Sequence, residues 1–87
     1  MYQIRLLEEA GKDLERLDRE IARRIVRKLS WLSENIENIR PRGLRSDLSG
    51  LSKLREGDYR VIYQVLAEEQ LIIVHFIGHR REVYKRG

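Results

Sequence analysis

The sequence predicts an α+β fold with an N-terminal strand, a helical hairpin, an antiparallel sheet of three or four strands and a short C-terminal helix or tail. Apolar residues alternate in residues 2–7, recur every three or four positions in residues 14–36, and alternate again in residues 51–84. A period of two is typical of strands, and a period near 3.6 is typical of amphipathic helices. The chain has 87 residues and no linker-like run, so we expect residues 1–87 to form a single domain.

The helical segment is expected to contain two helices. Its apolar stripe consists of Leu14, Leu17, Ile21, Ile25, Leu29, Leu32 and Ile36. Asp18 is a residue type that caps helix N-termini. We therefore expect a short helix to end near Leu17 and a longer one to run from about Arg19 to Glu34. One continuous helix is the alternative.

The next segment, residues 35–50, is predicted to form a loop. It contains Pro41, Gly43 and Gly50 among polar residues, and these residue types interrupt the helical period. A short edge strand near Leu44 is expected within it.

Two hairpins are predicted in the C-terminal half. Glu56 and Gly57 form the first turn, because a glycine supplies the positive φ that a tight hairpin needs, and residues 67–70 form the second turn. Symmetric pairing about these turns gives the pairs Arg55 with Asp58, Lys53 with Arg60, Leu66 with Leu71, and Arg60 with Ile77, with His79 beside Asp58.

This register separates an apolar face from a basic one. The helices are expected to cover Leu54, Val61, Tyr63, Val65, Ile72, Val74 and Phe76. The opposite face gathers Lys53, Arg55, Asp58, Arg60 and His79 above a floor of Leu51, Ile62 and Ile73. Like charges opposed across a strand pair destabilise a sheet, so the basic face predicts an anionic ligand.

The composition limits the classes of partner and compartment. The net charge of +4 favours anionic partners, and residues 40–60 carry six basic residues against three acidic ones. There is no cysteine, so disulfide and thiolate chemistry are excluded. The longest apolar run, residues 71–74, is too short for a membrane span, and the N-terminus lacks an apolar signal core. We expect a soluble, cytoplasmic protein with no membrane partner.

The residue types point to chemistry on a phosphodiester. The sequence has no Ser-His-Asp set and no Gly-rich phosphate loop. His75 and His79 are four positions apart, about 13 Å on a strand, so we expect no metal site and no cofactor. Several cations with one histidine can bind a phosphodiester, stabilise the charge that develops during in-line attack, and move a proton near neutral pH. If the substrate is RNA, its own 2′-hydroxyl supplies the nucleophile.

Two motifs identify a resemblance that covers essentially the whole chain. They are REGDYRVIY at residues 55–63 and GHRREVY at residues 78–84. Together with the order of elements, they resemble the RelE/ParE superfamily of toxin–antitoxin toxins. The resemblance to RelE-type members implies a ribosome-dependent mRNA interferase, an endoribonuclease that cuts mRNA in the ribosomal A site. The products are a 2′,3′-cyclic phosphate and a 5′-hydroxyl.

The resemblance also implies partners. The toxin would be held inactive by a cognate RelB-like antitoxin, whose acidic or amphipathic segment wraps the body and displaces or covers the C-terminal element. Its other partners would be the ribosome and mRNA. We expect a monomeric free toxin and a hetero-oligomer with the antitoxin.

The site residues follow from the resemblance position by position. The catalytic set is Lys53, Arg60, His79, Arg80 and Tyr84, and the RNA-binding set is Arg55, Arg81, Lys85 and Arg86. Leu51 stands where the RelE type has a further lysine, so no lysine base can act there. Lys53 is the best remaining base or transition-state cation, and Glu56 is less suited because it is expected at the turn. His79 is either the leaving-group acid, a passive phosphate ligand or a turn residue.

Structural roles compete with these assignments. Arg60 could pair with Asp58, Lys53 and Arg55 could protect a solvated edge strand, and Tyr84 could pack on the sheet instead of stacking on a base. The cations of the helices could bind ribosomal RNA or form an ordinary solvated surface: Arg16, Arg19, Arg23, Arg24, Arg27 and Lys28. Trp31 lies off the apolar stripe and is either partly buried or part of an interaction surface.

Three functions are therefore compatible with the sequence. The first is the ribosome-dependent endoribonuclease. The second is a ParE-like toxin that binds DNA gyrase and has no nuclease activity. The third is a degenerate toxin that only binds its antitoxin and represses its operon, which Leu51 keeps open.

Overall fold

The computed structural model describes residues 2–43 and 50–86, and for residues 39–43, Tyr84 and Arg86 it describes the backbone alone. The elements are β1 (Gln3–Leu6), α1 (Glu8–Arg16), α2 (Arg19–Gly43), β2 (Ser52–Glu56), β3 (Tyr59–Leu66), a 3-10 turn (Ala67–Glu69), β4 (Leu71–His79) and α3 (Arg80–Arg86). The strands form one sheet in the order β1-β4-β3-β2, with β1 parallel to β4 and the other pairs antiparallel. The α+β prediction is confirmed.

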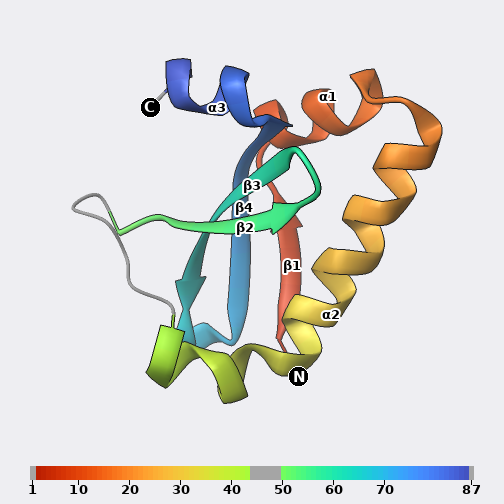
Figure 1. The fold of residues 1–87 in the computed structure, drawn as a ribbon. Coiled ribbons are helices and arrows are strands. Elements are labelled where there is room, and N and C mark those ends of the chain that lie inside the picture. The colour runs from red at the N-terminus through yellow and green to blue at the C-terminus, as the bar shows by residue number, and fades with distance from the viewer. Residues whose placement is uncertain (1, 44–49, 87) are drawn as a thin grey trace.

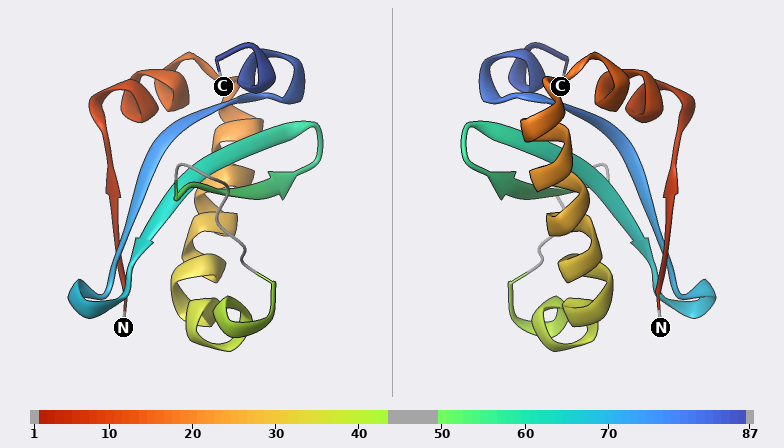
Figure 2. Two further views of the ribbon diagram at one scale, coloured as in Figure 1. Left: turned by 90° about the vertical axis from the view of Figure 1, so that its left-hand side faces the viewer. Right: turned by 90° about the vertical axis from the view of Figure 1, so that its right-hand side faces the viewer.

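The core lies between the sheet and α2. In Figures 1 and 2, α2 runs along one face of the sheet, while α1 and α3 lie at the same end of it. The helix contributes buried Ile25, Leu29, Leu32 and Ile36, and the sheet contributes Leu54, Val61, Tyr63, Ile72, Val74 and Ile77. None of the helices in the described ranges is long and apolar enough to cross a membrane.

The break between the two helices lies where the sequence predicts it. A carboxylate oxygen of Asp18 accepts a hydrogen bond from the backbone N–H of Glu20 at 3.1 Å, which caps the first turn of α2. The predicted end near Glu34 was wrong, because α2 continues to Gly43. Ile36, only 1% exposed, extends the packed stripe by another turn, so the core stabilises the helix beyond Glu34. The edge strand expected near Leu44 falls outside the described residues.

The α1 helix is tied to the sheet by a buried polar contact. Asp13, 7% exposed, accepts a hydrogen bond from the backbone N–H of Ile77 at 2.9 Å. This bond joins α1 to β4 two residues before β4 ends at His79, and therefore helps to position the junction with α3.

The first hairpin turns one residue later than predicted. Its two turn residues are Gly57 and Asp58, and Glu56 pairs with Tyr59. Gly57 has φ +60°, which suits the first central position of a type II′ turn. The predicted pairs of Arg55 and Lys53 are therefore wrong: Arg55 pairs with Arg60, and Lys53 pairs with Ile62. The shift is two positions, so every β2 and β3 side chain keeps its predicted face.

A β-bulge changes the second hairpin. Leu66 pairs with Leu71 as predicted, but Tyr63 pairs with Val74 while Ile62 pairs with Phe76, so His75 is an extra residue on β4. Beyond the bulge the faces of β4 are exchanged. Ile77, 2% exposed, takes the core position predicted for Phe76, and Arg60 pairs with Gly78 instead of Ile77. His79 pairs with Tyr59 and so lies on the helix-covered face, not on the basic face as predicted.

Candidate functional site

The open face of the sheet carries cations at its β2 end. We call Lys53, Arg55 and Arg60 the basic face. Arg55, Arg60 and Gly78 form one row across three strands, and Lys53, Ile62 and Phe76 form the next. Lys53 and Arg55 are exposed, whereas Arg60 is only 7% exposed. Two exposed cations, Lys53 and Arg55, therefore lie beside the nearly buried Arg60.

The Arg60 guanidinium is held by the β2–β3 turn. Its Nη1 atom donates hydrogen bonds to the carbonyl oxygens of Gly57 at 3.0 Å and Tyr59 at 2.9 Å. The sequence-based alternative, an ion pair with Asp58, is replaced by these bonds to backbone carbonyls. Because Nη1 donates to two carbonyl oxygens, this end of the guanidinium is held against the turn.

The α3 helix covers the open face next to Arg60. A Cβ atom at Gly78 would lie 3.5 Å from Cγ2 of Val83, which is 3% exposed, so α3 packs closely over this position. The Arg80 N–H also donates to the Asp58 carbonyl oxygen at 2.8 Å, joining α3 to the β2–β3 turn. The sequence did not reveal this packing role of Gly78, although a glycine within a strand signals a close approach.

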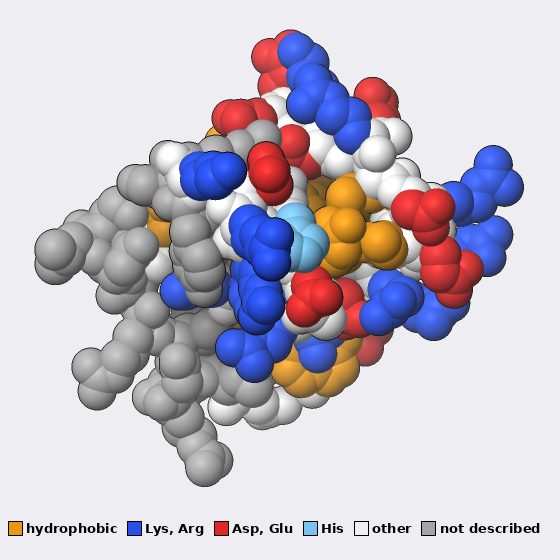
Figure 3. All heavy atoms as spheres, turned by 45° about the horizontal axis from the view of Figure 1, so that its top comes forward, with side chains coloured by type: hydrophobic (Ala, Val, Ile, Leu, Met, Phe, Trp, Pro, Cys, Tyr) orange, Lys and Arg blue, Asp and Glu red, His pale blue; other side chains and the backbone are white. Residues whose placement is uncertain are grey.

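The exposed cations of α3 extend the charge of this end. Arg80, Arg81 and Lys85 are exposed, whereas the side chains of Tyr84 and Arg86 lie outside the described residues. In Figure 3, Lys and Arg side chains gather beside a histidine, with Asp and Glu side chains around them. The structure thus brings the basic face and the α3 cations to the same end of the sheet.

His79 lies at the junction of β4 and α3. Its ring meets the edge of the Tyr59 ring with a centroid separation of 5.5 Å, and its Nδ1 accepts a hydrogen bond from the Arg81 N–H at 3.2 Å. An accepting Nδ1 carries no proton, so a neutral His79 ring is protonated on Nε2. His79 is therefore adjacent to the α3 cations in the chain but on the other sheet face from Lys53.

Metal-ligating groups do not cluster in the part of the chain that the structure describes. No three His, Cys, Asp or Glu side chains there come together in the way a metal site requires.

Glu56, the less favoured base, forms an ion pair with Arg24 of α2 at 3.5 Å. Glu56 therefore belongs to the α2 side of β2.

The family of the chain follows from comparison with known proteins. Residues 4–84 match the family model for the ParE toxin of type II toxin-antitoxin systems, parDE. The chain belongs to the RelE/ParE toxin superfamily. Toxin RelE of Mycobacterium tuberculosis is 31% identical to this toxin over 84 residues, which is 97% of this chain and 87% of the relative.

Solved structures show the same fold. Isolated RelE toxin of Escherichia coli superposes with a TM-score of 0.74 at 23% identity, covering 99% of this toxin and 98% of that chain. A chain of the toxin–antitoxin complex RelBE2 from Mycobacterium tuberculosis superposes with a TM-score of 0.70 at 28% identity, covering 91% of this toxin and 98% of that chain. The protein is a toxin of a type II toxin–antitoxin system.

Proposed function

We propose that this toxin is a ribosome-dependent endoribonuclease that cuts mRNA in the A site and therefore acts in the cytoplasm. The observation that carries the proposal is the basic face: Lys53 and Arg55 lie exposed beside the fixed guanidinium of Arg60. The sequence similarity to Toxin RelE supports the assignment to the RelE type of toxin. The substrate supplies the 2′-hydroxyl nucleophile, and the products are a 2′,3′-cyclic phosphate and a 5′-hydroxyl.

The cations of the basic face stabilise the transition state. In-line attack of the 2′-oxygen places additional negative charge on the phosphate oxygens, and fixed donors stabilise that charge without reorganising. Arg60 is the fixed donor, since the turn carbonyls hold its Nη1. Lys53 and Arg55 are exposed and approach the phosphate from β2. The proposed reaction needs orientation, charge stabilisation and proton transfer, and it is metal-independent.

Two protons must move during the reaction. Leu51 cannot accept the 2′-hydroxyl proton, so Lys53 is the proposed base or, if it stays charged, the cation nearest the attacking oxygen. His79 is the proposed acid for the leaving 5′-oxygen, through Nε2, because its Nδ1 is bonded to the Arg81 N–H. His79 and Lys53 lie on different sheet faces, so the RNA must pass the end of β4 to reach both.

The remaining predicted residues bind RNA in this proposal. Arg80 binds a phosphate oxygen near the reacting bond, and Arg81 and Lys85, both exposed on α3, contact flanking phosphates. Arg86 would do the same from the end of the helix. Tyr84 stacks on a base of the codon.

A translation assay tests the proposed activity. Purified toxin is added to a reconstituted translation reaction, and the 5′ ends of the mRNA are mapped with and without ribosomes. The proposal predicts cuts within codons that require ribosomes and leave 5′-hydroxyl ends. Intact mRNA in both reactions would contradict it.

A gyrase-binding function is the second candidate, because the matching family model is that of the ParE toxin. It predicts inhibition of gyrase supercoiling by the purified toxin and no cut mRNA. A toxin that affects neither mRNA nor gyrase, yet binds its antitoxin, would instead be the degenerate homologue.

We propose an antitoxin partner with an acidic amphipathic segment. A groove of about 370 Å³ lies along α1 and α2, with Leu14, Ala22 and Val26 as apolar lining and Arg19, Arg23 and Arg27 as basic lining. The three arginines recur every four residues on one helix face. Val26 is 47% exposed. The similarity to a chain of the RelBE2 toxin–antitoxin complex supports an antitoxin partner. A Val26→Asp change should weaken antitoxin binding, and unchanged binding would exclude this groove.

A further inference from the structure

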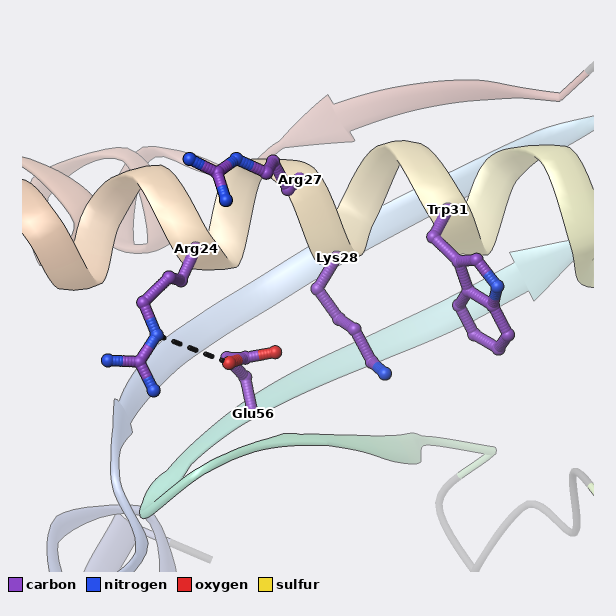
Figure 4. A pocket seen from close by; sticks show the side chains of 5 residues that line it. All are labelled: Arg24, Arg27, Lys28, Trp31 and Glu56. Carbon is purple, nitrogen blue, oxygen red and sulfur yellow. Dashed lines mark ion pairs between the residues drawn. The ribbon is translucent and has the colours of Figure 1, made fainter.

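A second groove lies on the opposite side of the β2 edge from the basic face. It has a volume of about 290 Å³ and is lined by Arg24, Arg27, Lys28, Trp31 and Glu56. Figure 4 shows Arg24, Lys28 and Trp31 extending from one side of α2, with Glu56 between Arg24 and Lys28. We call it the tryptophan groove. The proposed nuclease chemistry uses none of these five side chains.

Trp31 is the only tryptophan in the chain, and it is 41% exposed. Lys28 Nζ lies 4.7 Å from the centroid of its ring, within the range of a cation–π interaction. This contact restrains an aromatic ring that the core does not use. A restrained, exposed ring next to cations is the arrangement on which proteins stack unpaired bases.

The rest of the groove is charged. Arg24 and Glu56 form an ion pair across the groove, with side chains 49% and 23% exposed. Arg27 and Lys28 add two further positive charges to the lining. The Glu56 carboxylate can accept hydrogen bonds from the amino groups of a base, while the cations attract phosphates.

The lining favours a nucleotide over a protein segment. Four of its five residues are charged and the fifth is Trp31, so it contains no aliphatic side chain. Protein partners anchor apolar side chains in well-packed, desolvated pockets, as the groove at Leu14, Ala22 and Val26 would allow. The tryptophan groove offers one flat ring and charges instead.

Its position connects it to the basic face. Arg55 and Glu56 are neighbours on β2, and successive strand side chains point to opposite faces. Arg55 belongs to the basic face and Glu56 to the tryptophan groove, so one extended strand of RNA crossing the β2 edge would contact both.

We propose that the tryptophan groove binds an unpaired nucleotide of single-stranded RNA. The base stacks on Trp31, Lys28 contacts an adjacent phosphate, and Glu56 accepts hydrogen bonds from the base edge. The inference rests on the proposed function in taking RNA as the ligand, but it requires neither cleavage nor the ribosome.

Because the chain has one tryptophan, its fluorescence reports on this groove directly. The full-length toxin is titrated with a 2′-O-methyl RNA of twelve mixed nucleotides, which cannot be cut by 2′-hydroxyl attack. Stacking predicts saturable quenching of Trp31 fluorescence, with an affinity that falls as salt rises. RNA binding without quenching would overturn the proposal, and so would the absence of RNA binding.

Substitutions separate stacking from general charge attraction. The Trp31→Ala change should weaken binding of fluorescently labelled RNA roughly tenfold, as measured by anisotropy, and Lys28→Ala should weaken it less. Lys12→Ala is the matched control for lost charge, because Lys12 is exposed on α1 and pairs with Glu8. Equal affinities for Trp31→Ala and Lys12→Ala would contradict the proposal. Circular dichroism melting confirms that each variant is folded.

A further arm tests a protein ligand. A synthetic amphipathic peptide rich in glutamate replaces the RNA, and quenching by this peptide but not by RNA would overturn the assignment. The proposed nuclease activity and the proposed tryptophan groove can also be refuted independently of each other. Quenching without any ribosome-dependent cleavage would refute only the proposed nuclease, whereas cleavage without quenching would refute only the tryptophan groove.

Discussion

Arg55 on β2 and Arg60 on β3 are direct cross-strand partners, yet their environments differ. Arg55 is exposed, whereas Arg60 is 7% exposed and donates two hydrogen bonds to the carbonyl oxygens of its own turn. The carbonyl dipoles offset part of the repulsion between the two cations. The two opposed arginines therefore keep positive charge available for an anionic ligand.

Replacing Arg60 by alanine should destabilise the fold as well as remove a phosphate ligand. The two bonds to Gly57 and Tyr59 would be lost, and we expect the free energy of unfolding to fall by about 2 kcal/mol, since hydrogen bonds of charged groups are among the stronger ones. Urea denaturation measures it. The exposed partner provides the control, because Arg55→Ala should change stability by less than about 0.5 kcal/mol. Equal stabilities of the two variants would show that Arg60 does not hold the turn.

The bond between Asp13 and Ile77 predicts a graded effect of two substitutions. Asp13→Ala leaves the Ile77 N–H without its acceptor and should lower the free energy of unfolding by roughly 1–3 kcal/mol. Asp13→Asn keeps a side-chain oxygen and should lower it less. Thermal or urea unfolding of both variants checks the order, and an asparagine variant as unstable as the alanine variant would argue that the charge matters more than the acceptor.

Tyr63 predicts a loss of stability at alkaline pH. Its hydroxyl is buried and, among the described side chains, is the one buried polar atom without a hydrogen-bond partner. Burial raises the pKa of Tyr63 from 10.0 to about 12. Between these values the unfolded chain releases the proton and the folded protein keeps it, so the free energy of unfolding decreases as pH rises.

The matched variant for this effect is Tyr63→Phe. At pH 7 it should be as stable as the wild type or up to roughly 1 kcal/mol more stable, because it removes an unsatisfied hydroxyl. At pH 11 the wild type should have lost about 1 kcal/mol more than the variant, relative to pH 8. Parallel declines in urea titrations across this range would mean that Tyr63 does not titrate on unfolding.

His79→Gln distinguishes an acid from a positioning residue. If His79 protonates the leaving 5′-oxygen, the single-turnover cleavage rate should fall by roughly 10²–10⁴-fold. Binding to programmed ribosomes should change little. A variant that loses binding and cleavage in the same proportion would assign His79 to contact or to the junction with α3.

The sequence predicted the faces of the sheet better than its register. Alternation placed Leu54, Val61 and Tyr63 correctly in the core, because an error of two positions in the first hairpin preserves the face. The extra residue His75, in contrast, shifts the alternation by one position and exchanges the two faces of β4 beyond the bulge. The local alternation of apolar residues does not indicate this bulge, so His79 was assigned to the wrong face.

Contacts between residues close in the sequence could likewise be predicted, whereas contacts between distant elements could not. Lys28 and Trp31 are three residues apart, so their contact on α2 follows from helical spacing. The ion pair between Arg24 and Glu56 joins α2 to β2, and only the folded chain brings the two side chains together. The packing of Val83 of α3 over Gly78 is likewise a product of tertiary structure, although a strand glycine gave a hint of it.

We propose that the basic face performs the cleavage. The most direct measurement is the single-turnover rate of mRNA cleavage on programmed ribosomes for the double variant Lys53→Ala/Arg55→Ala. Lys12→Glu, which removes two units of net charge on α1, is the control. If the basic face stabilises the transition state, the rate should fall roughly 100-fold or more for the double variant and stay nearly unchanged for the control. Equal rates for both variants would contradict it.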